Sequence, residues 1–200
     1  MSECTVTHMT EERALSTAEA RRETVVASAI TVFARAGYAS TPITAVAEHA
    51  NISPAYVFKL FPGKVSLFVA ALRSCYERII EALEDGAARA ESGKPADVLH
   101  SMGEAYAALI ADRDLLMLQV HAQAATDVPE IAEAVRDGIG QITSLAASRS
   151  RGSTAEVQHF LAYGQLCHLL TTVDAFERDD SWAATLTDGI RHYPAKGGGE

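Results

Sequence analysis

The sequence predicts an all-α protein, and three observations support this. Apolar residues recur at intervals of three and four along most of the 200-residue chain, which is the spacing of one helix face. Alanine, the strongest helix former, is abundant, and no segment alternates apolar and polar residues as a half-buried strand does. Proline, glycine and asparagine fall between the apolar segments, where helices begin and end.

Charge is distributed unevenly along the chain. Residues 15–64 contain five basic and three acidic residues, whereas residues 65–200 contain 11 basic and 20 acidic residues. This asymmetry predicts that the two parts face different partners. The chain has no apolar run of ~18 residues, no secretory leader pattern and no paired spacing among its three cysteines. We therefore expect a cytoplasmic protein without a membrane partner.

The N-terminal part begins with polar, aperiodic sequence. Residues 1–17 carry no apolar stripe, so we expect a flexible arm. From residue 18 to residue 36 the apolar residues follow helical spacing and predict the first helix. Gly37 follows directly, in the position where a helix C-cap favours positive φ.

Two short helices follow. Thr41-Pro42 predicts an N-cap hydroxyl followed by the proline that favours the first helical position, and Asn51 is expected to end this second helix in the left-handed conformation. Ser53-Pro54 repeats that beginning for a third helix, which reaches only about Leu60. Two helices of about two turns, separated by a turn of about three residues, have helix-turn-helix spacing. We take residues 18–64 as one domain.

The remainder of the chain is also helical in pattern. A long amphipathic helix begins at Lys64 and is expected to fade near Asp85-Gly86. Further helices are predicted at residues 96–111, 113–125, 129–149, 154–177 and 181–192. We assign residues 65–194 to a second, larger helical domain and residues 195–200 to a disordered tail.

Enzyme signatures are missing from the sequence. No H-E-x-x-H, C-x-x-C or G-x-S-x-G string occurs, and the Pro62-Gly63-Lys64 segment lacks the earlier glycine of a phosphate loop because Phe58 stands there. We expect a protein that is not an enzyme and that has no cofactor and no metal site.

A set of residues spread over the three N-terminal helices is more specific. It consists of Gly37-Tyr38, Thr41, Val46-Ala47, Ala50-Asn51-Ile52-Ser53, Val57-Phe58-x-x-Phe61 and Lys64. In this order and spacing the residues resemble the DNA-binding domain of TetR-family transcriptional repressors. The resemblance implies a helix-turn-helix domain followed by a larger helical domain for ligand binding and dimerisation. The implied partners are a double-stranded DNA operator, a small-molecule effector and a second copy of the chain.

The resemblance, together with the exposed face expected of a short helix, gives a candidate DNA-binding set. Its members are Thr41, Thr44, Ser53, Pro54, Ala55, Tyr56, Phe58, Lys59 and Lys64. Phe58 departs from the tyrosine usual in the family, and Leu60 from the usual histidine or tyrosine, so polar contacts are lost at both positions. Structural alternatives to DNA contact remain open. Lys59 and Lys64 could be ordinary solvated lysines, and Tyr56 could be a half-buried packing residue.

The C-terminal part suggests an effector pocket and a dimer interface. The pocket candidates are methionine, aromatic and histidine residues on facing helices: Met102, Tyr106, Met117, His121, Phe160, Tyr163 and His168. Ordinary core packing is the alternative, and for most of these residues it is the favoured one. Segments 129–149 and 154–177 are the predicted dimer helices, and burial of 154–177 within one subunit is the alternative.

The resemblance also implies a mechanism, in which a ligand shifts the long helix Lys64–Leu83 and changes the spacing of two DNA-binding heads. The expected function is a ligand-responsive DNA-binding regulator, a repressor released by a small apolar or amphipathic molecule. The alternative is a small-molecule binding protein with a vestigial helix-turn-helix.

Overall fold

The computed structural model describes residues 3–190, with side chains from residue 18 onward. The described residues contain nine α-helices and one short 3-10 helix, and no strand occurs among them. Their bounds are α1 Glu3–Ser40, α2 Ile43–His49, α3 Pro54–Leu60, α4 Lys64–Ala88, α5 Pro95–Leu109, α6 Arg113–Ala124, α7 Pro129–Ser150, α8 Thr154–Thr172, η1 Ala175–Glu177 and α9 Ser181–Thr187. The all-α prediction is confirmed.

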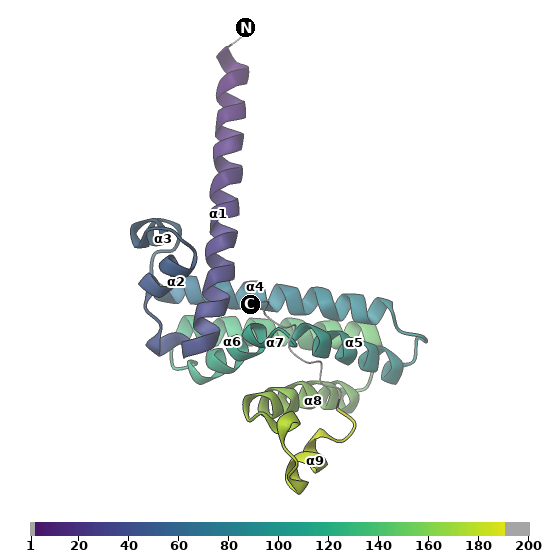
Figure 1. The fold of residues 1–200 in the computed structure, drawn as a ribbon. Coiled ribbons are helices and arrows are strands. Elements are labelled where there is room, and N and C mark those ends of the chain that lie inside the picture. The colour runs from purple at the N-terminus through teal and green to yellow at the C-terminus, as the bar shows by residue number, and fades with distance from the viewer. Residues whose placement is uncertain (1–2, 191–200) are drawn as a thin grey trace.

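The long helix α4 is the axis of the molecule. In Figure 1, α2 and α3 lie beside α1 at one end of α4, α5 to α7 pack along it, and α8 and α9 form a further layer. One face of α4 is buried along its whole length, and at its N-terminal end Phe68 meets Phe33 of α1 edge-on, with ring centroids 4.9 Å apart. One continuous apolar core therefore joins the N-terminal helices to the larger helical domain.

The first helix is longer than expected at its N-terminus and breaks where expected at its C-terminus. Gly37, with φ 74° and ψ 174°, interrupts the helical backbone of α1, which confirms the predicted break. The backbone is helical from Glu3 onward, although we expected an irregular arm over residues 1–17. The segment EERALSTAEA contains no glycine or proline and is rich in strong helix formers, so helix propensity outweighs the missing apolar stripe.

The turn between α2 and α3 is a Schellman motif. Asn51 adopts φ 53°, and its N–H donates to the carbonyl of Glu48 over 3.0 Å. The next N–H, of Ile52, donates to the carbonyl of Ala47, also over 3.0 Å, so two carbonyls in the last turn of α2 gain partners from the turn. Ser53 then caps α3 by accepting a hydrogen bond from the N–H of Tyr56. The predicted left-handed turn at Asn51 and the predicted helix cap at Ser53 are confirmed.

The predicted N-cap role of Thr41 is wrong. Thr41 is buried, its hydroxyl donates to the carbonyl of Gly37 over 2.7 Å, and Pro42 is the N-cap of α2 without a side-chain bond. The break at Gly37 leaves a carbonyl without its helical partner, and a threonine hydroxyl four residues later can satisfy it locally.

The C-terminal helices match their predicted positions closely, with two differences. The last helix, predicted over residues 181–192, already ends at Thr187. Segment 154–177 is divided: α8 ends at Thr172, Asp174 takes a left-handed φ of 51°, and η1 follows. Residues 191–192 of the last predicted helix and the predicted tail 195–200 lie outside the described residues. Within residues 3–190 no single helix is long and apolar enough to cross a membrane; α3 and α4 reach that length and composition only as a pair bent by 69°.

Candidate functional site

The short helix α3 buries one face and exposes the other. Val57 and the C-cap residue Phe61 are almost completely buried against the N-terminal core. The opposite face is open to solvent and carries Pro54, Ala55, Phe58 and Lys59, with Tyr56 half-buried beside it. Phe58 is 53% exposed, which is high for a phenylalanine and places an apolar ring on the outer surface.

Two arginines of α1 support α3, and sequence reasoning missed both. The guanidinium of Arg22 donates to the carbonyl of Leu60 over 2.8 Å and lies 4.2 Å from the ring centroid of Phe61. It therefore satisfies a carbonyl at the C-terminal end of α3, where a cation is favourable. The Arg21 guanidinium lies 5.7 Å from the ring of Tyr56. No signal in the sequence pairs these arginines with α3, because 34 or more residues separate the partners.

Three of the predicted DNA-facing residues outside α3 differ in their surroundings. Lys64 donates from Nζ to the carbonyl of Ala39 over 3.0 Å and lies 4.6 Å from the ring centroid of Tyr38, so it helps to hold the corner after α1. Thr44 is exposed in the first turn of α2. Thr41 is 1% exposed with its hydroxyl occupied, so it does not share the surface formed by the others.

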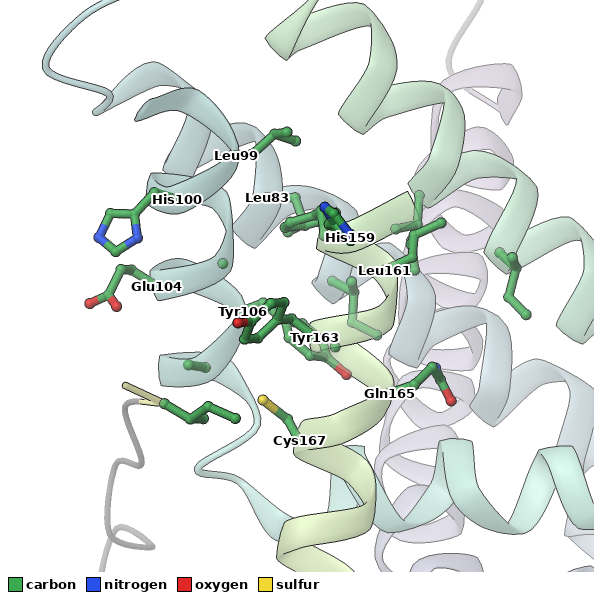
Figure 2. Close-up of a pocket in the computed structure, with 18 of the residues that line it drawn as sticks. Leu83, Leu99, His100, Glu104, Tyr106, His159, Leu161, Tyr163, Gln165 and Cys167 are labelled. Carbon is green, nitrogen blue, oxygen red and sulfur yellow. The ribbon is translucent and has the colours of Figure 1, made fainter. Parts of the chain in front are cut away.

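A cavity of ≈ 740 Å³ lies in the larger helical domain, bordered by α4, α5, α6, α7 and α8. The lining residues that bear on function are Tyr76, Ile79, Leu83, Leu99, His100, Glu104, Tyr106, Gln119, Gln123, Ile139, Ile142, Glu156, His159, Phe160, Leu161, Tyr163, Gln165 and Cys167. Figure 2 labels Tyr106 of α5 and Tyr163 of α8 among the lining residues, with His100 and Glu104 further along α5. The cavity has the size and the mixed apolar and polar lining of a small-molecule site.

The structure brings three of the seven predicted pocket residues to this cavity: Tyr106, Phe160 and Tyr163. The other four do not line it. Met102 is fully buried in the core, and Met117 lies on α6 outside the lining. His121 packs against Gly37 of α1, and His168 lies behind Tyr106.

A small polar network supports the Tyr106 wall. The Tyr106 hydroxyl lies 2.6 Å from Nε2 of His168, and Nε2 of Gln119 is 3.5 Å from the same oxygen. Burial lowers the pKa of His168 to about 4, so its imidazole is neutral near pH 7, and burial raises the pKa of Tyr106 well above its usual value. Among the described side chains, Nδ1 of His168 is the buried polar atom without a hydrogen-bond partner.

Sequence reasoning missed the polar rim of the cavity. His100 and Glu104 are four residues apart on α5, and Gln119 and Gln123 are four residues apart on α6. These polar stripes were visible in the sequence, and they indicate which faces of α5 and α6 line the cavity. In the part of the chain that the structure describes, no three His, Cys, Asp or Glu side chains group closely enough to hold a metal ion.

Comparison with known proteins agrees with this arrangement. Residues 25–71 match the family model described as bacterial regulatory proteins, tetR family. The chain is 30% identical over 145 residues to the HTH-type transcriptional repressor KstR of Mycolicibacterium smegmatis, covering 71% of this chain and 69% of that protein.

Solved structures share the fold at lower sequence identity. A TetR-like transcriptional regulator from Rhodococcus sp. RHA1 superposes with a TM-score of 0.62 at 22% identity, covering 83% of this chain and 91% of the other. The regulator FadR from Bacillus subtilis, in complex with stearoyl-CoA, gives a TM-score of 0.60 at 14% identity over 83% and 94% of the two chains. The family match, the KstR similarity and the shared fold lead to one assignment: the chain belongs to the TetR family of bacterial regulatory proteins.

Proposed function

We propose that this TetR-family chain is a transcriptional repressor that leaves its operator when a small apolar or amphipathic effector enters the cavity beside α4. The observation that carries the proposal is the placement of an exposed α3 face and a ≈ 740 Å³ cavity at different positions along one long helix. The similarity to KstR, which is named a repressor, supports the sign of regulation. The stearoyl-CoA bound by B. subtilis FadR supports an effector with a large apolar part. Acting on DNA, the protein would work in the cytoplasm.

On DNA, we expect α3 to enter the major groove, which accommodates an α-helix. The exposed Pro54, Ala55 and Phe58 would then meet base edges and thymine methyl groups through apolar contact. Lys59 and Thr44 would contact phosphates, and Lys64 would add a cation at the beginning of α4. Phe58 brings no hydroxyl to this surface, so phosphate contacts depend more on the two lysines.

A second copy of the chain would cover the outer apolar face of α8. Leu169 is 52% exposed, Val173 is 45% exposed, and Trp182 of α9 is 44% exposed. Ile139 of α7, at the edge of the cavity, is also a large apolar side chain with high exposure, at 42%. This supports α7 and α8 as the dimer helices. A two-fold dimer would place two α3 helices on half-sites about 34–36 Å apart or a multiple of that distance.

Two helices connect the cavity with the DNA-binding domain. The cavity wall includes Ile79 and Leu83 of α4, whose first residue, Lys64, is bonded to the corner at Ala39. The wall also includes Gln119 and Gln123 of α6. His121, which lies between them on the same helix, packs against Gly37 of α1. An effector that binds one position of these helices better than the other would shift the spacing of the two DNA-binding heads.

The test is DNA binding by the full-length protein to fragments that flank its own gene, measured by fluorescence anisotropy at several salt concentrations. A regulator should bind one fragment specifically, with affinity that falls steeply as salt rises. An effector that binds the protein must then change operator affinity by the same factor by which the operator changes effector affinity. If no fragment is bound specifically while a ligand is, the protein is instead a small-molecule binding protein with a vestigial helix-turn-helix.

A further inference from the structure

The described lining of the cavity carries acidic side chains and no lysine or arginine. Its charged side chains among the described residues are two carboxylates, Glu104 of α5 and Glu156 of α8. Glu104 has a further interaction within the chain. The negative charge in the cavity is therefore assigned to Glu156. Glu156 accepts hydrogen bonds from the backbone N–H and the hydroxyl of Ser153, both over 2.7 Å, and these bonds lower its pKa. Glu156 therefore remains ionised near neutral pH.

The apolar part of the lining is rich in aromatic rings. Tyr76 of α4, Tyr106 of α5, and Phe160 and Tyr163 of α8 all contribute to the wall. Gly103 lies next to the Phe160 ring and Gly164 next to the Tyr106 ring, since a β-carbon at either glycine would make an ordinary van der Waals contact with that ring at 3.9 Å. The faces of aromatic rings carry partial negative charge and attract cations.

We infer that the effector of this cavity is an organic cation with an apolar body, such as a substituted ammonium, rather than a carboxylate or a phosphate ester. A cationic head finds a carboxylate and several aromatic faces on the described lining, and an apolar body finds Ile79, Leu83 and Leu99. An anionic head would meet a like charge at Glu156 and should therefore bind more weakly than a cationic one. The inference depends on the proposed effector site and specifies its ligand class.

A headgroup series tests the inference directly. Decyltrimethylammonium, decanol and decanoate share one alkyl chain and differ in charge, and calorimetric titration into the full-length protein at low salt measures the dissociation constant of each. We expect the ammonium to bind about 10-fold tighter than the alcohol and the carboxylate to bind most weakly. Tightest binding of decanoate overturns the inference, and so does equal binding of all three.

Variants assign the preference to named groups. Glu156→Gln removes the charge while keeping a side chain that can still accept from Ser153 in the capping box, so the beginning of α8 should be preserved. Tyr163→Leu removes an aromatic ring that is already 61% exposed and keeps an apolar side chain. Each change should weaken ammonium binding severalfold and reduce decanol binding by a clearly smaller factor. Glu23→Gln, an exposed charge removal on α1 outside the cavity lining, is the matched control and should alter neither.

Failure of this inference and failure of the proposed function give different results. If decanoate binds best and releases the operator fragment, the protein is an effector-controlled regulator and the assigned ligand class is wrong. If none of the three probes binds while the fragment is still bound specifically, the assigned ligand class is also wrong, and DNA binding stands. If no fragment is bound specifically, the regulator function fails whatever the headgroup preference.

Discussion

His121 of α6 occupies the space beside Gly37 so closely that a β-carbon on Gly37 would stand 2.9 Å from Nδ1 of the imidazole. Gly37 also has φ 74° and ψ 174°, a backbone region that is essentially restricted to glycine. Two residues to either side of His121, Gln119 and Gln123 line the cavity from the other side of α6. A single helix thus separates the cavity from the corner where the DNA-binding domain begins its turn toward α2.

We therefore predict that Gly37→Ala destabilises the protein. The alanine must adopt an unfavourable backbone conformation, which costs about 1–3 kcal/mol, and its β-carbon must also displace His121. Chemical denaturation measures the change in unfolding free energy. In a His121→Ala background the steric contact is gone. Gly37→Ala should then lower the unfolding free energy by a smaller amount, which is the backbone part of the effect. Wild-type stability of Gly37→Ala would contradict the backbone argument.

Arg22 is expected to act on DNA binding only through α3. Arg22→Ala removes the hydrogen bond to the Leu60 carbonyl and the contact with the Phe61 ring, and should lower the unfolding free energy by about 1–2 kcal/mol. The looser α3 should weaken operator binding at every salt concentration without changing the slope of log affinity against log salt. A reduced slope would mean that Arg22 itself contacts phosphate.

Lys59 is expected to show the opposite behaviour. It is exposed, and none of its described neighbours forms an ion pair with it, so Lys59→Ala should leave the unfolding free energy nearly unchanged. If its ammonium contacts phosphate, the salt slope of operator binding falls in magnitude by about 1 per subunit. Anisotropy titrations at four or more salt concentrations give this slope, and an unchanged slope would remove Lys59 from the DNA contacts.

Local signals explain how much of the fold the sequence predicts. Gly37, Asn51 and Ser53-Pro54 fix helix ends through backbone conformation and capping, and all act within a few residues, so the helix-turn-helix followed from the sequence. Thr41 was misassigned because two local hydrogen bonds compete for its hydroxyl, and only the folded corner at Gly37 decides between them.

The cavity was predicted less well, because its composition depends on which faces of five helices meet. Tyr106 and His168 were correctly associated with one region, yet Tyr106 lines the cavity while His168 supports it from behind. His121 has the residue type of a ligand contact and lies on the opposite face of α6, against the DNA-binding domain. The type of a residue indicates which contacts it can make. Only the packing of the helices decides whether its side chain faces the cavity or the opposite side.

Burial of His168 predicts a loss of stability in acid. Its pKa is about 4 in the folded protein against about 6.5 when unfolded, so the unfolded chain binds more protons between these values. Unfolding free energy should therefore fall as pH decreases from about 6.5 toward 4, by about 2 kcal/mol between pH 7 and pH 5 from this residue. His168→Phe should show a smaller decrease over the same interval by denaturation at both pH values. An equal decrease in variant and wild type would assign the pH dependence to other groups.

Two glycines of α7 are expected to respond in opposite directions to the same substitution. A β-carbon on Gly138 would lie 2.3 Å from the ring of Tyr76, whereas one on Gly140 would meet nothing within 4 Å. Gly138→Ala must displace an aromatic ring that also lines the cavity, so it should cost about 1–3 kcal/mol of stability and weaken effector binding. Gly140→Ala replaces a glycine within an exposed helix surface and should stabilise by up to about 1 kcal/mol. Thermal and chemical unfolding of the two variants give the sign of each change. If both stabilise, Tyr76 moves aside without cost, and the close packing of α4 against α7 at Gly138 does not constrain the cavity wall.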